Sequence, residues 1–378
     1  MRIGIEAQRI FRHKKRGIDL VAIELIRSLQ EIDKKNEYII FVKPDVDRCI
    51  DETENFRIVD LPAAPYPIWE QFYLPKAALF EKCDILHCTS NTAPMFCKVP
   101  LILTLHDIAN LDNIHSFRKE YSTYQKMAIK YRRFVVPKAV HKSKRIITVS
   151  EFEKKCIKDY FNLEDKKVNV IHTGIGKKFK KIDDTVILEN TRKKYHLPEK
   201  FILFHGSKDP KRNIKTMLAG YSIYFSHSNE KIPLVILNFN KEKLNKIIRE
   251  LNNPDLLNHI ITIGYVSNSE LPAIYSLAAI MLYPSLSESF GMPILEAMAC
   301  GVPVITSNIL SLSEITDNAA MQIDPTQPIE IAFALQKLTT NAVLASDLIK
   351  KGYLRVAAFS WLTMSEKVLE IYDDIWKA

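Results

Sequence analysis

Short apolar runs alternate with amphipathic segments along almost the whole chain, and this alternation limits the fold more than any other feature. Strand-length runs separated by helical three- and four-residue spacing are typical of strand–helix–strand units with parallel sheets. The predicted strands are residues 3–5, 38–42, 57–59, 85–87, 101–105, 145–149, 168–171, 201–205, 234–237, 260–263, 280–283, 304–306 and 321–323. The predicted helices include residues 18–31, about 117–142, 214–225, 241–251, 270–277, 293–300 and 328–338. The sequence therefore predicts the α/β class with doubly wound parallel sheets.

The chain is long enough for two domains, since 378 residues correspond to about two units of 100–200 residues each. A polar, Lys-rich stretch over residues 174–200 interrupts the alternation and is interpreted as a linker. We expect one domain over residues 1–182, a second over 183–359, and an amphipathic helix over 360–378. Doubly wound sheets bind ligands beyond the carboxyl ends of their strands, where the strand order reverses. This favours a site in a cleft between the two domains.

Positive charge is concentrated in the first half of the chain. Residues 1–182 hold 34 Lys and Arg against 23 Asp and Glu, a net charge of +11, whereas the whole chain carries +9. A basic domain suits nucleic acid, an anionic membrane surface or an anionic substrate, or it is simply a soluble face. The six cysteines form no CxxC pair, and no apolar run reaches the ~20 residues of a membrane span. These features favour a cytoplasmic protein with reduced thiols.

The segment Glu288-Ser-Phe-Gly-Met-Pro-Ile-Leu-Glu296 is the strongest sign of a binding site. Pro293 suits the first turn of a helix, and Gly301 with Pro303 ends the helical run. Glu288 is thus predicted to lie on a loop and Glu296 in the first turn of the helix. A helix N-terminus attracts phosphate, and two carboxylates suit vicinal hydroxyl groups. The segment predicts a pocket for a sugar phosphate; the alternative is a helix-favoured glutamate with an unrelated one upstream.

Further motifs accompany this segment. They are Thr104-Leu-His-Asp107, Val170-Ile-His-Thr-Gly174, Gly206-Ser-Lys-Asp-Pro-Lys-Arg-Asn213, Gly264-Tyr-Val-Ser-Asn-Ser-Glu-Leu271, Tyr283-Pro-Ser285 and Ala299-Cys-Gly-Val-Pro-Val304. Together they resemble the retaining glycosyltransferases of family four, which have the GT-B architecture of two facing Rossmann-like domains. The run Trp69-Glu-Gln71 before Ile85-Leu-His87, with His106-Asp107, is most similar to the subgroup that holds many bacterial mannosyl- and rhamnosyltransferases of O-antigen and capsule assembly. In GT-B proteins the final helix crosses back onto the first domain, and this is expected of residues 360–378.

The resemblance implies a role for each matching position. The implied catalytic residues are His106, Glu288, Lys211 and Arg212, and the implied donor-binding residues are Gly17, Lys208, Tyr265, Val266, Phe290, Gly291, Met292 and Glu296. Glu288 would contact the transferred sugar and Glu296 the ribose of a nucleotide sugar. The cations would stabilise the departing diphosphate, where negative charge develops. Lys208 could share that task, because the order Lys211-Arg212 reverses the family's usual order.

Several of these positions keep a second interpretation. His106 follows an apolar strand, so it either touches the donor sugar or is a buried, hydrogen-bonded histidine. Gly17 follows Arg16 where the family often has paired glycines, so this basic connection either meets an anion or is a surface loop. Lys211 and Arg212 would be solvated loop charges outside the motif context.

The sequence predicts a hexosyltransferase of cell-surface polysaccharide synthesis, with a mannose-like sugar favoured. The expected partners are a GDP- or UDP-sugar and a glycan or polyprenyl-linked acceptor, with no nucleic acid and no cofactor. Asp45-Val-Asp47 has the form of a metal-binding motif but lacks a second chelating group nearby, and the family is metal-independent. A same-fold phosphorylase would need a pyridoxal lysine, for which no segment is seen. The remaining alternative is a non-catalytic GT-B partner that only binds nucleotide sugar.

The predicted helix over residues 117–142 indicates membrane contact. Its apolar and aromatic side chains share one face by spacing, and its lysines fall largely off that face; the stripe is Phe117, Tyr121, Tyr124, Ala128, Tyr131 and Val135. Such a stripe beside lysines suits the interface of an anionic bilayer. The alternative is that the stripe packs on the domain's own sheet. The sequence predicts peripheral contact with the inner face of the cell membrane.

Overall fold

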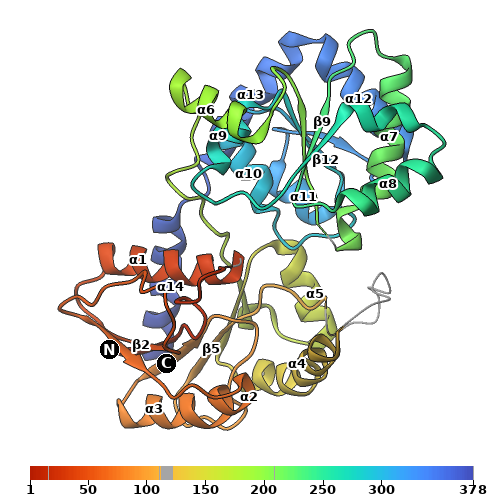
Figure 1. The fold of residues 1–378 in the computed structure, drawn as a ribbon. Coiled ribbons are helices and arrows are strands. Elements are labelled where there is room, and N and C mark those ends of the chain that lie inside the picture. Colours follow the sequence, from red (N-terminus) through yellow and green to blue (C-terminus); the bar gives the residue numbers. More distant parts are fainter. Residues whose placement is uncertain (16, 110, 112–121, 208, 378) are drawn as a thin grey trace. The chain divides into compact units, whose positions relative to one another are not determined.

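The computed structural model describes residues 1–15, 17–109, 111, 122–207 and 209–377. The chain forms two compact units, each with its own sheet (Figure 1). Unit 1 comprises Met1–Gly174 and Phe359–Ala378, and unit 2 comprises Ile175–Ala358. The described helices include none that is long and apolar enough to cross a membrane.

Unit 1 is built on a seven-stranded sheet in the order β3-β2-β1-β4-β5-β6-β7, and each neighbouring pair is parallel. The strands are β1 (Arg2–Glu6), β2 (Glu37–Val42), β3 (Phe56–Asp60), β4 (Ile85–Cys88), β5 (Leu101–Thr104), β6 (Arg145–Thr148) and β7 (Val168–Val170). The helices are α1 (Gly17–Ile32), α2 (Tyr66–Ile68), the π-helix η1 (Trp69–Tyr73), α3 (Leu74–Phe80), α4 (Thr123–Lys142), α5 (Glu151–Phe161), η2 (Asp165–Lys167) and α14 (Trp361–Lys377).

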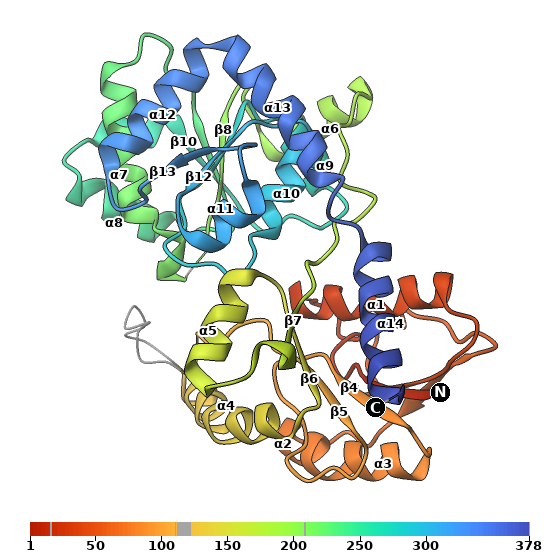
Figure 2. The same ribbon diagram turned by 180° about the vertical axis from the view of Figure 1, so that it is seen from behind.

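The two faces of the unit 1 sheet are covered by different helices. Strand β4 alternates its side chains, so that Leu86 and Cys88 enter the core that α3, α4 and α5 also fill. His87 points to the other face, where Nδ1 lies 2.7 Å from the Tyr372 hydroxyl of α14 and Nε2 lies 2.7 Å from Thr104 Oγ1. Burial lowers the pKa of His87 to about 3, so the ring is neutral at ordinary pH. Helix α14 lies beside α1 in both views (Figures 1 and 2).

Unit 2 is built on a six-stranded parallel sheet in the order β10-β9-β8-β11-β12-β13. The strands are β8 (Ile202–His205), β9 (Leu234–Leu237), β10 (Ile260–Ile263), β11 (Ile280–Tyr283), β12 (Val304–Ser307) and β13 (Met321–Ile323). The helices are α6 (Thr185–Tyr195), η3 (Pro210–Arg212), α7 (Ile214–His227), α8 (Lys241–Glu250), η4 (Pro254–His259), α9 (Leu271–Leu277), α10 (Met292–Ala299), α11 (Leu310–Thr316), α12 (Pro328–Thr340) and α13 (Ala342–Val356). The α/β class with two parallel-sheet units is confirmed.

The boundaries between the units differ from the predicted ones. The chain divides after Gly174 and again after Ala358, whereas the sequence placed the divisions after residues 182 and 359. The stretch over residues 174–200 is also more than a linker, because it contains α6. Asp184 caps α6 by accepting from the N–H groups of Val186 and Ile187, and Tyr195 at its end donates to Glu270 before α9. A polar composition concealed this helix, since α6 has no fully buried side chain.

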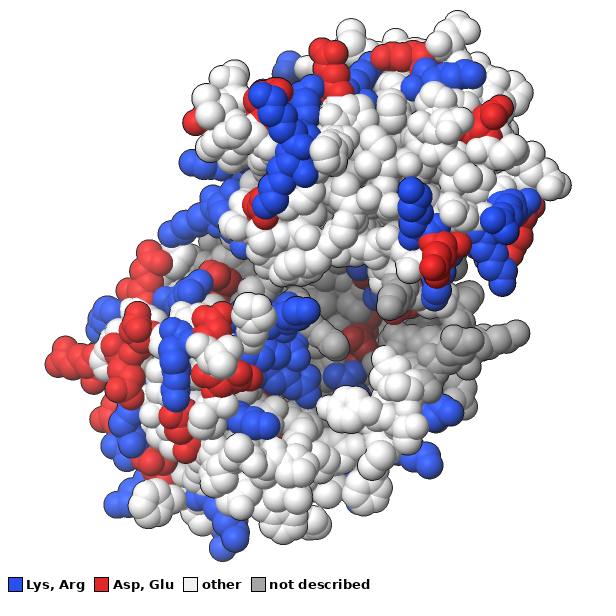
Figure 3. Space-filling view, viewed as in Figure 1, with Lys and Arg blue, Asp and Glu red and all other residues white. Residues whose placement is uncertain are grey.

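The predicted stripe on α4 is divided between two environments. The helix begins at Thr123, capped by Ser122, and the stripe residues Phe117 and Tyr121 lie outside the described residues. Val135 is fully buried in the unit 1 core, as the packing alternative requires. Tyr124, however, is 79% exposed. Figure 3 shows that charged side chains crowd the part of this unit around β2 and α1, whereas the part over α2 and α4 is largely uncharged.

Gly174→Ala should destabilise unit 1, because a Cβ atom there would lie 2.3 Å from the backbone nitrogen of Trp361 at the start of α14. We expect the free energy of unfolding to fall by about 1–3 kcal/mol, as in other overpacked sites. All three tryptophans, Trp69, Trp361 and Trp376, lie in unit 1, so urea unfolding followed by tryptophan fluorescence reports on this unit. Gly17→Ala is the matched control, because nothing lies within 4 Å of its added Cβ. Equal midpoints for the two variants would show that α14 is not held this tightly.

Candidate active site

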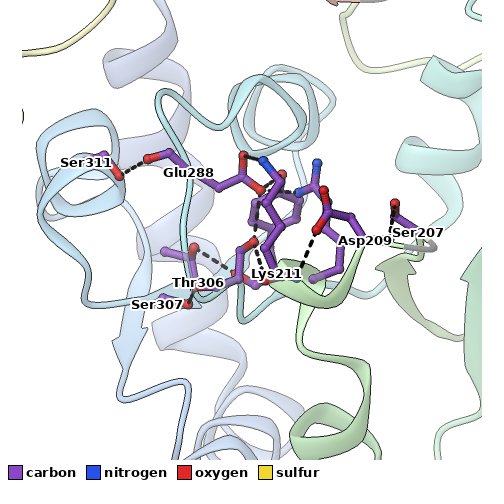
Figure 4. Close-up of polar contacts among 10 residues, drawn as sticks. Ser207, Asp209, Lys211, Glu288, Thr306, Ser307 and Ser311 are labelled. Atoms are coloured by element: carbon purple, nitrogen blue, oxygen red, sulfur yellow. Dashed lines mark hydrogen bonds and ion pairs between the residues drawn. The ribbon is translucent and has the colours of Figure 1, made fainter. Parts of the chain in front are cut away.

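The predicted catalytic residues of unit 2 meet where the strand order of its sheet reverses. Strands β8 and β11 are neighbours in the sheet. Strand β8 is followed by η3, and β11 is followed by the loop that carries Glu288. The next strand after β8 lies on one side of this pair, and the next strand after β11 lies on the other side. At such a switch point the two connections diverge and leave room for a ligand beyond the strand ends. Lys211 and Arg212 come from the first connection and Glu288 from the second, and their side chains converge (Figure 4).

Glu288 is the centre of this cluster. Its side chain is only 8% exposed, and Oε1 lies 2.6 Å from Arg212 Nη1 while Oε2 lies 3.3 Å from Lys211 Nζ. The Tyr283 hydroxyl donates to Oε1 over 3.2 Å, and Ser285 Oγ lies 2.9 Å from it. A buried carboxylate needs such partners, because its desolvation is costly when it is left unpaired. The arrangement joins one anion to two cations, so it offers net positive charge to a ligand.

Backbone contacts fix the positions of the two cations. The carbonyl of Lys211 accepts from the N–H of Leu286 over 2.8 Å. Ser285 Oγ also lies 3.0 Å from this carbonyl, so its single proton is donated either here or to Glu288. Asn213, in the left-handed region with a φ of 60°, donates from Nδ2 to the carbonyls of Pro284 and Pro325 over 3.1 and 2.6 Å. The η3 turn is thereby tied to the segment after β11. Ser285 and Asn213 are residues to which sequence reasoning gave no role, although both lie inside motifs that it had quoted.

Glu296 lies deeper in α10 than predicted. The helix begins at Met292, one residue before Pro293, so Glu296 is its fifth residue and has left the first turn. The Tyr275 hydroxyl donates to Glu296 Oε2 over 3.0 Å. Burial raises the pKa of Glu296 to about 7, against the opposing effects of the Tyr275 hydrogen bond and the charge of Lys178. Glu296 is therefore a carboxyl group that changes charge near neutral pH.

Gly291 is required at the start of α10. Its φ is 92°, which L-residues with side chains rarely adopt, and an added Cβ would lie 2.6 Å from Leu312 Cδ2. Phe290 is buried at 6% exposure, and the N–H of Ile294 is bonded to the carbonyl of Gly291. That N–H is therefore not open to a ligand, contrary to the expectation from sequence. The helix N-terminus at Met292 still presents its positive end to the switch point.

The remaining donor-site predictions in unit 2 lie apart from this cluster. Tyr265 is 74% exposed and Val266 is 4% exposed, and both follow β10, an edge strand separated from β8 by β9. Within the described part of the chain, no hydrogen bond or ion pair joins either side chain to Glu288 or Glu296. Lys208 lies outside the described residues.

The predicted residues of unit 1 follow the carboxyl ends of its own strands. His106 follows β5 and is 7% exposed; its Nε2 lies 3.1 Å from the carbonyl of Thr89, and its backbone N–H donates to Asn91 Oδ1 over 2.6 Å. Because a carbonyl only accepts, Nε2 carries the proton. Burial lowers the pKa of His106, which favours the neutral ring. His106 is thus a buried histidine bonded at Nε2, with Nδ1 as its remaining acceptor.

The basic connection before α1 is partly neutralised by carboxylates. Arg12 forms an ion pair with Asp19, and Lys15 forms one with Asp47. Asp47 belongs to the motif that resembles a metal site, so its carboxylate here has a cationic partner. Gly17 is the first residue of α1, and the space around it is open.

Two buried carboxylates of unit 1, each with its own hydrogen bonds, were missed by sequence reasoning. Glu6, at the end of β1, is fully buried and accepts from the N–H groups of Gln8 and Thr89 over 3.1 and 3.2 Å; burial raises its pKa. Glu70, also fully buried, accepts from Tyr66 and Gln71 over 2.7 and 2.8 Å, and from Thr92 and Tyr131. The one signal in the sequence is a glutamate that ends an apolar strand at Glu6.

Comparison with known proteins identifies two family models along the chain. Residues 15–177 match the model of Glycosyltransferase Family 4, and residues 188–355 match that of Glycosyl transferases group 1. The serotype-specific mannosyltransferase WbdA of Escherichia coli is 28% identical over 228 residues, which cover 60% of this chain but only 28% of that longer protein. The O-antigen chain mannosyltransferase B of Escherichia coli is 26% identical over 272 residues, 72% of this chain and 69% of that one. The solved structure of Anabaena HepE in complex with UDP superposes with a TM-score of 0.72 at 15% identity, covering 99% of this chain and all of that chain.

Glu296→Gln should weaken the binding of a nucleotide sugar at pH 8 by at least about tenfold, because a neutral amide loses charge-assisted hydrogen bonds with hydroxyls. The parent should bind more tightly as the pH rises through about 7, where Glu296 ionises, and the variant should not. The diphosphate diester of the ligand stays ionised throughout this range. Calorimetry at pH 6 and pH 8 measures both effects, with the exposed Glu242→Gln as the control. Unchanged affinity would remove Glu296 from the site.

The same pKa shift has a consequence for stability. The folded-state pKa of about 7 exceeds the ordinary value of 4.5, so the contribution of Glu296 is fully present below 4.5 and is lost as the pH rises through 7. Without ligand, Glu296→Gln should therefore make the unfolding of unit 2 less sensitive to pH across this window.

Lys211→Ala and Arg212→Ala should differ in their effects on stability. Lys211 is one-third exposed, so its loss should cost less than about 1 kcal/mol, whereas Arg212 also lies 4.7 Å over the Tyr283 ring and its loss should cost about 1–3 kcal/mol. Both variants should lower turnover at least about tenfold, since both remove charge from the site. Thermal unfolding and activity assays separate the effects. Lys215→Ala, which removes an exposed ion pair with Glu250, should change neither. A Lys211→Ala variant with normal turnover would assign phosphate binding elsewhere.

Proposed function

Because the chain belongs to the glycosyltransferases described by the family 4 and group 1 models, we propose that it transfers a hexose from a nucleotide diphosphate sugar to a glycan or lipid-linked acceptor. Its two parallel-sheet units have the Rossmann-like form of the GT-B class, to which the solved neighbours also belong. The proposal includes retention of the anomeric configuration and a mannose-like sugar. The relatives named as mannosyltransferases support this choice of sugar.

The observation that carries the proposal is the convergence of Lys211, Arg212 and Glu288 at the switch point of the unit 2 sheet. Breaking the bond between an anomeric carbon and a diphosphate places negative charge on the leaving oxygen. Two cations fixed by backbone contacts stabilise that charge without having to reorganise. Glu288 keeps the cations in place and offers oxygen atoms to sugar hydroxyls. Glu296, bonded to Tyr275, is assigned to the ribose hydroxyls of the donor.

The proposal assigns no metal ion to the reaction. The described residues contain no group of three or more His, Cys, Asp and Glu side chains that could hold one. The cations and the N-terminus of α10 supply positive charge at the place where a metal would otherwise act. The donor is a GDP- or UDP-sugar; UDP is the nucleotide in the solved HepE complex.

The acceptor is assigned to unit 1, in which His106 and Glu6 follow or end strands and Glu70 is buried in η1. We further propose that the protein acts in the synthesis of cell-surface polysaccharide, at the inner face of the cell membrane. The O-antigen relatives support it. The alternative is a non-catalytic partner that only binds nucleotide sugar. The loss of Glu288, Glu296 or the two cations would have favoured it, and all of them are present.

A donor panel tests the proposal directly. Purified protein is incubated with GDP-mannose, UDP-glucose and dTDP-rhamnose, with and without a glycan acceptor and with a chelator present. We expect turnover of GDP-mannose above the others, unaffected by the chelator, and a retained anomeric configuration in the product by NMR. Glu288→Gln, which keeps the shape of the side chain, is the inactive control. Binding of a donor without turnover would favour the non-catalytic alternative, and no binding of any donor would overturn the proposal.

A further inference from the structure

Large apolar side chains of unit 1 gather on the surface formed by α2, η1, α3, the loop before β5 and the first half of α4. Phe80 and Phe96 are 83% and 84% exposed, and Tyr124 is 79% exposed. Phe72, Leu79 and Met127 are each more than half exposed as well. We call this the apolar face of unit 1. Single exposed apolar residues are ordinary, but a contiguous group of this kind marks an interaction surface.

A groove crosses the apolar face. Its apolar lining includes Ile68, Phe72, Leu79, Met95 and Phe96. Its volume is about 510 Å³. Lys76 and Lys98 also line it, so the groove combines apolar side chains with two cations.

These exposed side chains are not the core-facing side of a helix that failed to be buried. Helix α3 already has a buried face, since Leu74 and Ala78 are fully buried in the core. Its opposite face carries Leu79 and Phe80, where an ordinary surface helix carries polar residues. The preceding η1 repeats the pattern, with Trp69 buried and Phe72 exposed. Both elements therefore present apolar groups on two sides.

The buried Glu70 network holds the parts of the apolar face together. The rings of Tyr66 on α2 and Tyr131 on α4 meet edge to face at 6.1 Å. Gln71 Nε2 lies 2.9 Å from the Tyr131 hydroxyl, and both Tyr66 and Tyr131 donate to Glu70. These bonds cross from α2 and η1 to α4. The apolar face is thus one surface of fixed shape.

In residues 65–98 and in α4, every exposed charge is positive. Helix α4 contains six Lys and Arg and no Asp or Glu, and Lys126 and Lys130 are exposed beside Tyr124 and Met127. Residues 65–98 contain three carboxylates. Glu70 is buried in its network, Glu81 is paired with Arg57, and Asp84 accepts from the N–H of Arg2.

We propose that the apolar face of unit 1 rests on an anionic lipid bilayer. Phe72, Phe80 and Phe96 would enter the headgroup region, while Lys76, Lys98 and Lys126 contact lipid phosphates. A second copy of the chain does not fit this surface, because two such faces would bring like charges together. The inference rests on the proposed transfer to a lipid-linked acceptor for its biological purpose, and it places the membrane contact mainly on α2, η1 and α3, where the sequence had placed it on α4.

Flotation of the full chain with vesicles tests the inference. Vesicles of equal parts phosphatidylcholine and phosphatidylglycerol should carry the parent protein at low salt, and vesicles of phosphatidylcholine alone should carry much less. Phe80→Ser/Phe96→Ser should reduce the bound fraction at least about tenfold at any salt concentration. Lys126→Gln/Lys130→Gln should reduce it at least about tenfold at low salt and less at high salt, since salt screens exposed charges.

A control variant in unit 2 and a donor-hydrolysis assay show whether a loss of flotation is specific to the apolar face. Phe333→Ser on α12, which is 69% exposed in unit 2, should float as the parent does. Donor hydrolysis should be unchanged in Phe80→Ser/Phe96→Ser. If the parent floats with vesicles but turns over no donor, the proposed function is contradicted and the proposed membrane-binding surface is still supported. A parent that stays soluble at low salt, or a control that loses as much binding as the test variants, would overturn the membrane surface. A dimer in sedimentation that Phe80→Ser/Phe96→Ser dissolves, without flotation, would assign the face to a second copy instead.

Discussion

The candidate site depends on the charges and hydrogen bonds that surround the buried Glu288 carboxylate. An ionised carboxylate at 8% exposure is tolerated only when charges and hydrogen bonds replace its water. Those partners come from η3 and from the end and continuation of β11, and Ser311 at the start of α11 binds the Glu288 carbonyl as well (Figure 4). Two connections thus supply the partners of the carboxylate, and a third holds the backbone of Glu288. In the proposed function, this arrangement would present Lys211 and Arg212 to a diphosphate.

The two units share a sheet topology but differ in the charges at the point where the strand order reverses. Each sheet reverses its strand order once, between β1 and β4 in unit 1 and between β8 and β11 in unit 2. Both reversals hold a buried carboxylate. Glu288 has two cations, whereas Glu6 accepts from the neutral N–H groups of Gln8 and Thr89 and from the Thr89 hydroxyl, and burial raises the pKa of Glu6. The site of unit 2 therefore offers positive charge and that of unit 1 offers neutral hydrogen-bonding groups, which agrees with the proposed division between donor and acceptor.

The fold could be predicted from sequence because strands buried on both faces appear as unbroken apolar runs, as β9 and β11 do. Element ends were less predictable: α10 begins one residue early because Gly291 adopts a left-handed conformation, and α6 has no apolar face to reveal it. The Glu70 network could not be foreseen, since Thr92 and Tyr131 lie 22 and 61 residues away in the sequence. Periodicity predicts which face a residue occupies, but long-range hydrogen bonds depend on which loops meet. The site motifs were found because their residues are close in sequence.

The protonation states around α10 determine how the site responds to pH. His205, at the end of β8, lies stacked 6.4 Å from Tyr275, the residue that holds Glu296. Burial, with a smaller contribution from the charge of Arg212, lowers the pKa of His205 to about 4, so this ring adds no charge at neutral pH. Glu296 has a pKa of about 7 and therefore changes charge where His205 does not. Hydroxyls that donate to Glu296 stabilise its ionised form and lower its pKa further. If Glu296 binds a ribose as proposed, binding near neutral pH would release a fraction of a proton per ligand bound, because the bound hydroxyls favour the ionised carboxylate.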